Sequence, residues 1–272
     1  MNKSFLAALL LVALIPTADF FYTVWRTPHL VLLAAATPAV LITVAAIIFA
    51  AGERGVLRLL AATFFWGAIA ASFVSSSVNE LAQVWMSRTF GNADAQYFAP
   101  SLVAPLVEEA AKGAALLVLM RLRSGGVKDG IIYGGLIGVG FAMTENMQYF
   151  LLAAIQGGTS GLGRAMYVRT LLGGLNHALF TATIGVGIGW SRTHAASALP
   201  AAIGFVLAVA QHILWNTLAS PEITEELCNA TAGGSCAPSP ELFTLLVTAP
   251  LIAAASLAPG ILLIAWTMRV SK

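Results

Sequence analysis

The sequence predicts an all-α protein, a bundle of about eight transmembrane helices. Apolar residues make up 58% of the 272-residue chain and charged residues only 10%, whereas a soluble domain carries about 25% charged residues. The mean hydropathy is +0.85, and apolar runs of about 20 residues, long enough to cross a bilayer, recur along the chain. These observations exclude an ordinary water-soluble globule. The net charge of +2 and the absence of a basic tract argue against a nucleic-acid partner.

The apolar runs define the expected helices in chain order. They cover roughly 5–25, 30–51, 57–78, 100–120, 130–154, 166–190, 197–219 and 242–268. The first run could be a signal peptide, but Pro16 interrupts the candidate cleavage region and the apolar run continues to Trp25, so we expect an uncleaved helix. The polar segment 79–99 still carries apolar residues, as is typical of an interfacial or re-entrant piece. We expect one transmembrane domain over 1–272.

The basic residues predict that both termini are cytoplasmic. The opposite side would hold only Arg26, Arg88, Arg164 and Arg169, while the cytoplasmic segments would hold Lys3, Arg54, Arg58, Arg121, Arg123, Lys128, Arg192, Arg269 and Lys272. The last outer loop, 221–241, contains glutamates, no lysine or arginine, and the two cysteines, Cys228 and Cys236. A disulfide between them would need an oxidising compartment, which the charge pattern independently assigns to that side.

Ionisable residues lie inside four consecutive predicted helices: Glu108, Glu109, Glu145, His177 and His212. At a rise of 1.5 Å per residue, all of them fall in one layer, roughly 10–17 Å below the outer surface. Charged groups at membrane depth are costly unless they are paired, hydrated or bound to a ligand. A cluster at one depth is therefore a functional site by default.

The adjacent glutamates share a helix face with Lys112, which is i+4 from Glu108 and i+3 from Glu109. Two carboxylates in a low dielectric cannot easily both ionise, and Lys112 offsets part of that cost. A pair with split proton affinities suits a general acid or base. A structural ion pair between helices is the alternative interpretation.

The remaining polar residues suggest supporting roles. Asn216 lies one helical turn after His212, and we expect it to orient the imidazole or to bind a substrate carbonyl. Asn146 points away from Glu145, so we expect it to form an interhelical hydrogen bond. Lone buried histidines are usually core residues, but two of them at the depth of three glutamates favour a site.

Two chemistries are compatible with these residues. Glu145, His177 and His212 suffice to bind a catalytic zinc with an open position for water, and Glu108 or Glu109 would then be the base. Without a metal, one glutamate would deprotonate water while a histidine and an asparagine stabilise the oxyanion. A proton- or cation-coupled transporter and a non-catalytic scaffold are the alternative classes.

Glycines inside the predicted helices indicate close helix packing, whereas those between two predicted helices indicate a loop. The spacing of Gly130, Gly134 and Gly138, and of Gly185 and Gly189, is the small-xxx-small pattern of tightly packed membrane helices. A Gly-x-Ser-Gly sequence occurs at 158–161, but it lies in a glycine-rich stretch, 157–163, that we expect to be a flexible outer loop. No His-Glu-x-x-His motif occurs in the chain.

Four ordered motifs within about residues 100–220 resemble those of the PrsW family of intramembrane proteases, which is distantly similar to the CAAX-prenyl-protease/bacteriocin-immunity group. They are Pro105-Leu-Val-Glu108-Glu109-Ala-Ala-Lys112, Gly140-Phe141-Ala-Met-Thr-Glu145-Asn146, His177-Ala-Leu-Phe-Thr and His212-x-x-Trp-Asn216. Compared with CAAX proteases, Lys112 stands where an arginine one position later is usual, and Glu145 stands where a histidine is usual. These departures favour the PrsW branch and argue against prenylated substrates.

The resemblance implies a glutamate-dependent peptidase, often described as a metalloprotease, that spans the bacterial cytoplasmic membrane several times. Such enzymes are associated with the cleavage of membrane-anchored regulators, such as anti-sigma factors, on the extracytoplasmic side. We therefore expect a membrane-anchored protein or peptide as substrate, the lipid bilayer as surroundings and zinc as the metal.

Overall fold

The computed structural model describes residues 3–49, 56–123, 125–195, 197–218, 246–247 and 249–270. Within these ranges the chain is helical and has no strands, which confirms the all-α prediction. Cys228 and Cys236 lie outside the described residues, so their pairing stays a prediction. The described stretches that are long and apolar enough to cross a membrane number 5, so the predicted count of eight is approximate: His29–Ile48, Leu57–Phe90, Val127–His194, Leu199–Thr217 and Ala249–Arg269.

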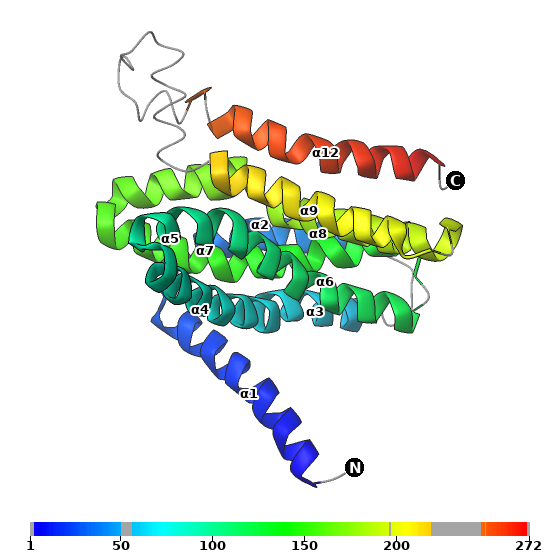
Figure 1. Ribbon diagram of the computed structural model, residues 1–272, viewed down its shortest axis with the longest axis horizontal. Helices are drawn as coiled ribbons and strands as arrows, with labels where there is room; N and C mark the ends of the chain where they lie inside the picture. Colours follow the sequence, from blue (N-terminus) through cyan, green and yellow to red (C-terminus); the bar gives the residue numbers. More distant parts are fainter. Residues whose placement is uncertain are drawn as a thin grey trace.

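Several helices lie close to their predicted positions. They are α1 (Lys3–Arg26), α2 (His29–Phe49), α6 (Ala104–Arg123) with the preceding π-helical turn η2 (Ala99–Val103), α9 (Leu199–Leu218) and α12 (Ala249–Val270). The helix α12 lies alongside α9 on one side of the bundle, while α1 diverges from the bundle on the other side (Figure 1). The functional residues lie on the helices between them.

The third predicted helix is longer than expected. Helix α3 (Val56–Phe65), the π-helical turn η1 (Trp66–Ala71) and α4 (Ser72–Phe90) form one continuous helical stretch. The sequence places a boundary near residue 78, and this was wrong because the polar residues beyond it recur at helical spacing on one face of α4. The stretch ends at Gly91, whose φ of 100° favours glycine. A short helix, α5 (Asn92–Phe98), then leads into η2.

Helix α7 (Val127–Met166) is central, since it packs against α2, α3, η1, α6 and α8 (Asn176–Trp190). The predicted small residues make its contact with α8 unusually close. A Cβ atom added at Gly130 would lie 2.1 Å from the carbonyl oxygen of Gly185, and one at Gly138 would lie 2.0 Å from that of His177. The predicted packing role of these glycines is therefore confirmed.

The glycine-rich stretch 157–163 is not the loop that the sequence suggests. Most of it is helical, but the backbone leaves the helix at Gly158, where φ is 58° and ψ is −146°, so α7 consists of two helical segments that meet at a kink. A Cβ atom at Gly161 would lie 2.4 Å from the carbonyl oxygen of Ala153, so the chain folds back on itself at this corner. Glycine permits both the left-handed backbone and the close approach. The Gly-x-Ser-Gly sequence thus begins at the kink between the two helical segments of α7.

The sixth predicted helix is interrupted. The π-helical turn η3 (Tyr167–Leu172) follows α7 directly, residues 173–175 leave the helix, and α8 begins at Asn176. The break falls on Gly173 and Gly174, where leaving the helix costs least. His177 is therefore the second residue of a new helix rather than a residue in the middle of a continuous one.

Candidate functional site

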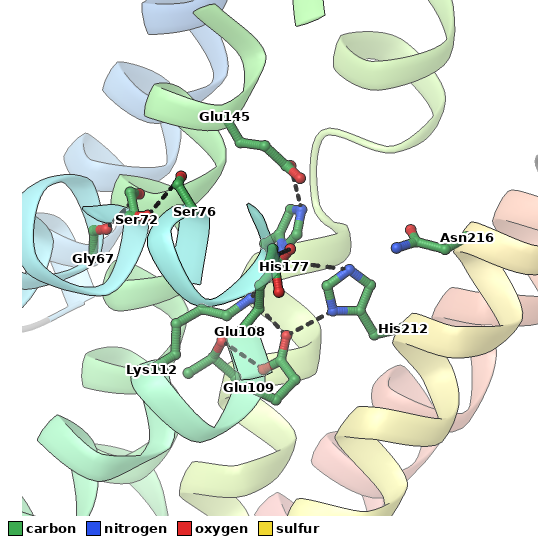
Figure 2. Close-up of polar contacts among 12 residues, drawn as sticks. Gly67, Ser72, Ser76, Glu108, Glu109, Lys112, Glu145, His177, His212 and Asn216 are labelled. Atoms are coloured by element: carbon green, nitrogen blue, oxygen red, sulfur yellow. Dashed lines mark hydrogen bonds and ion pairs between the residues drawn. The ribbon is translucent and has the colours of Figure 1, made fainter. Parts of the chain in front are cut away.

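The structure brings the predicted ionisable residues into one connected cluster (Figure 2). Helix α6 contributes Glu108, Glu109 and Lys112, while α7 contributes Glu145, α8 His177 and α9 His212. The Lys112 ammonium is 2.6 Å from Glu109 Oε1 and 3.1 Å from His177 Nδ1. Since these residues come from four helices, their meeting depends on the packing described above, and above all on the close approach of α8 to Gly138.

Glu109 is completely buried and its two oxygens both have partners. Besides the bond from Lys112, Oε1 lies 3.0 Å from His212 Nδ1, and the Thr181 hydroxyl donates to Oε2 at 3.2 Å. A carboxylate held in this way has no free oxygen for a water molecule. It is well placed to orient the imidazole of His212.

Glu108 has fewer hydrogen-bond partners than its neighbour. Asn79 of α4 donates to its Oε1 at the long distance of 3.4 Å. Its Oε2 is buried and has no hydrogen-bond partner, and it lies 3.8 Å from His212 Nε2 and 3.9 Å from Lys112 Nζ. A buried carboxylate oxygen without a partner is costly, so this atom is poised to accept a proton or to bind a cation.

A cavity of about 390 Å³ opens onto Glu108 and Glu145, and this volume is within the usual range for ligand sites. Its lining residues come from four parts of the bundle. They are Ser72, Ser75, Ser76, Asn79, Glu80 and Gln83 of α4, Ala99, Pro100, Val103, Ala104 and Glu108 of η2–α6, Phe141, Thr144, Glu145, Gln148, Tyr149 and Leu152 of α7, and Asn216 of α9. Glu109 is not among them, so only one of the adjacent glutamates faces the cavity.

Glu145 is tied to a residue that the sequence did not single out. Arg169 of η3 forms an ion pair with Glu145 Oε2, and the same oxygen lies 2.9 Å from His177 Nε2. Arg169 also donates to Asn146 Oδ1 at 2.7 Å, and its guanidinium lies 3.8 Å from the Tyr149 ring centroid. The predicted interhelical hydrogen bond of Asn146 is thus confirmed. The charge pattern assigns Arg169 only to the outer side of the membrane, because nothing local to it indicates an ion pair with Glu145.

Asn216 lies at the cavity, but its contact is not the expected one. Its amide donates to the Pro100 carbonyl oxygen at 3.0 Å, and the role of orienting His212 falls to Glu109 instead. Phe141 supports the site as well, since its ring centroid lies 4.1 Å from Lys112 Nζ. A cation–π contact of this kind helps to hold a buried ammonium group.

The donor atoms that could share a metal ion belong to Glu108, His177 and His212, which lie within 4.8 Å of one another. This set differs from the predicted one, because Glu108 replaces Glu145. The residues fit a metal in two respects. Glu108 Oε2 has no hydrogen-bond partner, and His212 turns Nδ1 to the Glu109 carboxylate and Nε2 toward Glu108 Oε2. Carboxylates on the outer nitrogen are typical of metal-binding histidines. His177 would have to give up a contact to bind the ion, since Nε2 lies against the Glu145 carboxylate and Nδ1 against the Lys112 ammonium.

The comparison with known proteins agrees with this geometry. A family model described as PrsW family intramembrane metalloprotease matches residues 55–255, which is more than half of the chain and includes every helix that contributes to the site. No curated protein and no solved structure matches the chain. The family description favours a hydrolase over a transporter, which the same intramembrane charges would also fit. The chain therefore belongs to the PrsW family of intramembrane metalloproteases and is a membrane-embedded peptidase.

Proposed function

We propose that this peptidase cleaves a membrane-anchored protein near the outer leaflet, with water activated by a glutamate beside a metal ion, which is most simply zinc. The observation that carries the proposal is the unpartnered Glu108 Oε2, which faces His212 next to the cavity. The positive-inside pattern and the depth of the ionisable residues in the sequence support the outer side of the membrane.

Glu108, His177 and His212 are the residues that would hold the metal. Two neutral imidazoles and one carboxylate form a usual ligand set of catalytic zinc sites, in which a position stays open for water. When bound, the ion would polarise the scissile carbonyl and make a water molecule more acidic. Glu109 orients His212, and Lys112 balances the buried negative charge of Glu109.

Glu145 is the proposed general base. It faces the cavity, its side chain is 16% exposed, and its ion pairs with Arg169 and His177 both use Oε2. That arrangement leaves Oε1 to accept a proton from water as the oxygen of the water adds to the carbonyl carbon. The same proton then passes to the leaving amine as the carbon–nitrogen bond breaks. Asn216 remains a candidate for binding the substrate carbonyl, as the sequence suggests.

Metal content and cleavage together test these roles. We expect purified wild-type protein to contain zinc, to cleave a single-span reporter protein and to lose cleavage with a chelator. Glu108→Gln should lose both metal and cleavage, whereas Glu145→Gln should keep the metal and lose cleavage by about a hundredfold or more. A folded wild-type protein that binds no metal and cleaves fully in chelator would instead support the metal-free mechanism, with Glu108 as the base. Full cleavage by both variants would end the proposal.

A further inference from the structure

One face of α4 is polar although the helix belongs to a stretch, Leu57–Phe90, that is apolar enough to cross a membrane. The residues of this face recur at helical spacing and all line the cavity: Ser72, Ser75, Ser76, Asn79, Glu80 and Gln83. Apolar residues on the opposite side of α4, such as Val74 and Leu81, are exposed as expected for contact with lipid. We call the six cavity-lining residues the α4 polar face.

Two atoms of the α4 polar face are buried without a hydrogen-bond partner. They are Ser75 Oγ and Asn79 Oδ1, and Ser75 as a whole is only 1% exposed. Asn79 also reaches Glu108 Oε1 through its amide nitrogen. Buried polar atoms in native proteins nearly always have partners. Residues that line a cavity beside reactive groups and carry unpartnered polar atoms therefore indicate a polar occupant.

The chemistry of the reaction suggests what that occupant is. In a transmembrane helix every main-chain N–H and C=O group is paired within the helix, because lipid offers no other partner. A peptide bond becomes accessible to water only when the helix unwinds around it, and this frees several main-chain groups that need new partners. From Ser72 to Gln83 the α4 polar face is about 16 Å long, which matches about five residues of extended chain.

We infer that the α4 polar face binds the main chain of the substrate in an unwound, extended form. Ser75 and Asn79 form hydrogen bonds to peptide groups beside the scissile bond, and α4 thereby lowers the free energy of unwinding at the point of cleavage. The partner is a membrane-anchored segment that is recognised through its backbone. This inference rests on the proposed function, because it takes Glu108 and Glu145 to mark the reacting end of the cavity.

A double-mutant cycle between protein and substrate tests the inference. The probe is a synthetic single-span peptide that the wild-type protein cleaves in detergent micelles, with the cleaved bond located by mass spectrometry. Single peptide bonds on either side of that bond are replaced by esters, each of which removes one N–H donor. We expect an ester at one or more positions to lower kcat/KM of the wild-type protein by about threefold to tenfold. In Ser75→Ala or Asn79→Ala the effect at that position should largely disappear.

Ser77→Ala is the matched control. Ser77 lies on the same helix but does not line the cavity. Its hydroxyl donates to the Phe73 carbonyl oxygen, just as the hydroxyl of the cavity-lining Ser76 donates to the Ser72 carbonyl oxygen. It should keep the full ester effect. Each comparison uses two substrates on one protein preparation, so a poorly folded variant lowers both rates and leaves their ratio unchanged.

Ester effects that are identical in all variants at every position would overturn the inference and would indicate that the α4 polar face only hydrates the site. That result would leave the roles of Glu108 and Glu145 intact, because it requires an active enzyme. Failure of the proposed function would show itself differently, as full cleavage by Glu108→Gln and Glu145→Gln.

Discussion

Two regions of the site differ in how completely their polar atoms are paired. The floor, made of Glu109, Lys112 and Thr181, is fully buried, and both oxygens of its carboxylate accept hydrogen bonds. The mouth, made of Glu108, Glu145 and Asn79, lines the cavity and contains unpartnered oxygens on Glu108 and Asn79. The comparison teaches that adjacent glutamates of one helix can have opposite roles. Paired groups hold the histidines in position, and unpaired groups are left for water, metal or substrate.

The largest expected effect is at the floor. Lys112→Met leaves the Glu109 carboxylate buried without its cation, and breaking such a pair costs about 3–5 kcal/mol. Unfolding in detergent, followed by circular dichroism, should show this loss of stability. Glu109→Gln combined with Lys112→Met should recover much of it, because residue 109 then carries no charge that needs the ammonium group. Equal stability of Lys112→Met and wild-type protein would contradict the role assigned to the floor.

At the mouth we expect a loss of activity with little loss of stability. Arg169→Met removes the cation that holds Glu145, and loss of such an orienting partner typically costs 10- to 100-fold in activity. Steady-state cleavage should show a lower kcat with a nearly unchanged KM, and Arg169→Lys should restore part of the rate. If Arg169→Met unfolded instead, Arg169 would have a structural role like that of the floor residues.

His177 joins the two regions, since Nδ1 contacts Lys112 and Nε2 contacts Glu145. Gly138→Ala should displace it, because the added Cβ would lie 2.0 Å from its carbonyl oxygen. We expect a cost of about 1–3 kcal/mol together with reduced cleavage. Gly135→Ala is the matched control, as nothing lies within 4 Å of a Cβ there. Equal stability and equal cleavage rates of the two variants would show that the close approach of α8 to α7 does not determine the position of His177.

The smallest expected effect concerns one hydroxyl group. Thr181→Val removes the hydrogen bond to Glu109 Oε2 and should cost about 1 kcal/mol, with a cleavage rate that falls a few-fold. Thr183→Val removes a hydroxyl on the same helix that bonds to Leu179 and Gln211 instead. It should lower stability by a similar amount and leave cleavage unchanged. Reduced cleavage by both variants would indicate a general loss of packing.

The sequence was a good guide to the helices and to which residues meet. Hydropathy located the transmembrane stretches, and the shared depth of Glu108, Glu145, His177 and His212 anticipated the cluster that the structure contains. The sequence was a poor guide to the contacts that individual polar side chains make. Asn79 seemed to begin a separate polar segment, and Arg169 seemed to be only a charge at the outer side of the membrane, although Asn79 contacts Glu108 and Arg169 contacts Glu145.

What the sequence determined by itself is therefore local: which stretches prefer lipid, which glycines allow helices to approach, and which helices carry the ionisable residues. These properties follow from the residues of one segment and from the regular rise of the helix. Only the tertiary structure decided which of Glu108 and Glu109 faces the cavity, where the chain bends at Gly158, and that α4 forms a wall of the site. The physical reason is that partners and cavities depend on how each helix is rotated and shifted against its neighbours, which long-range packing sets and no single segment encodes.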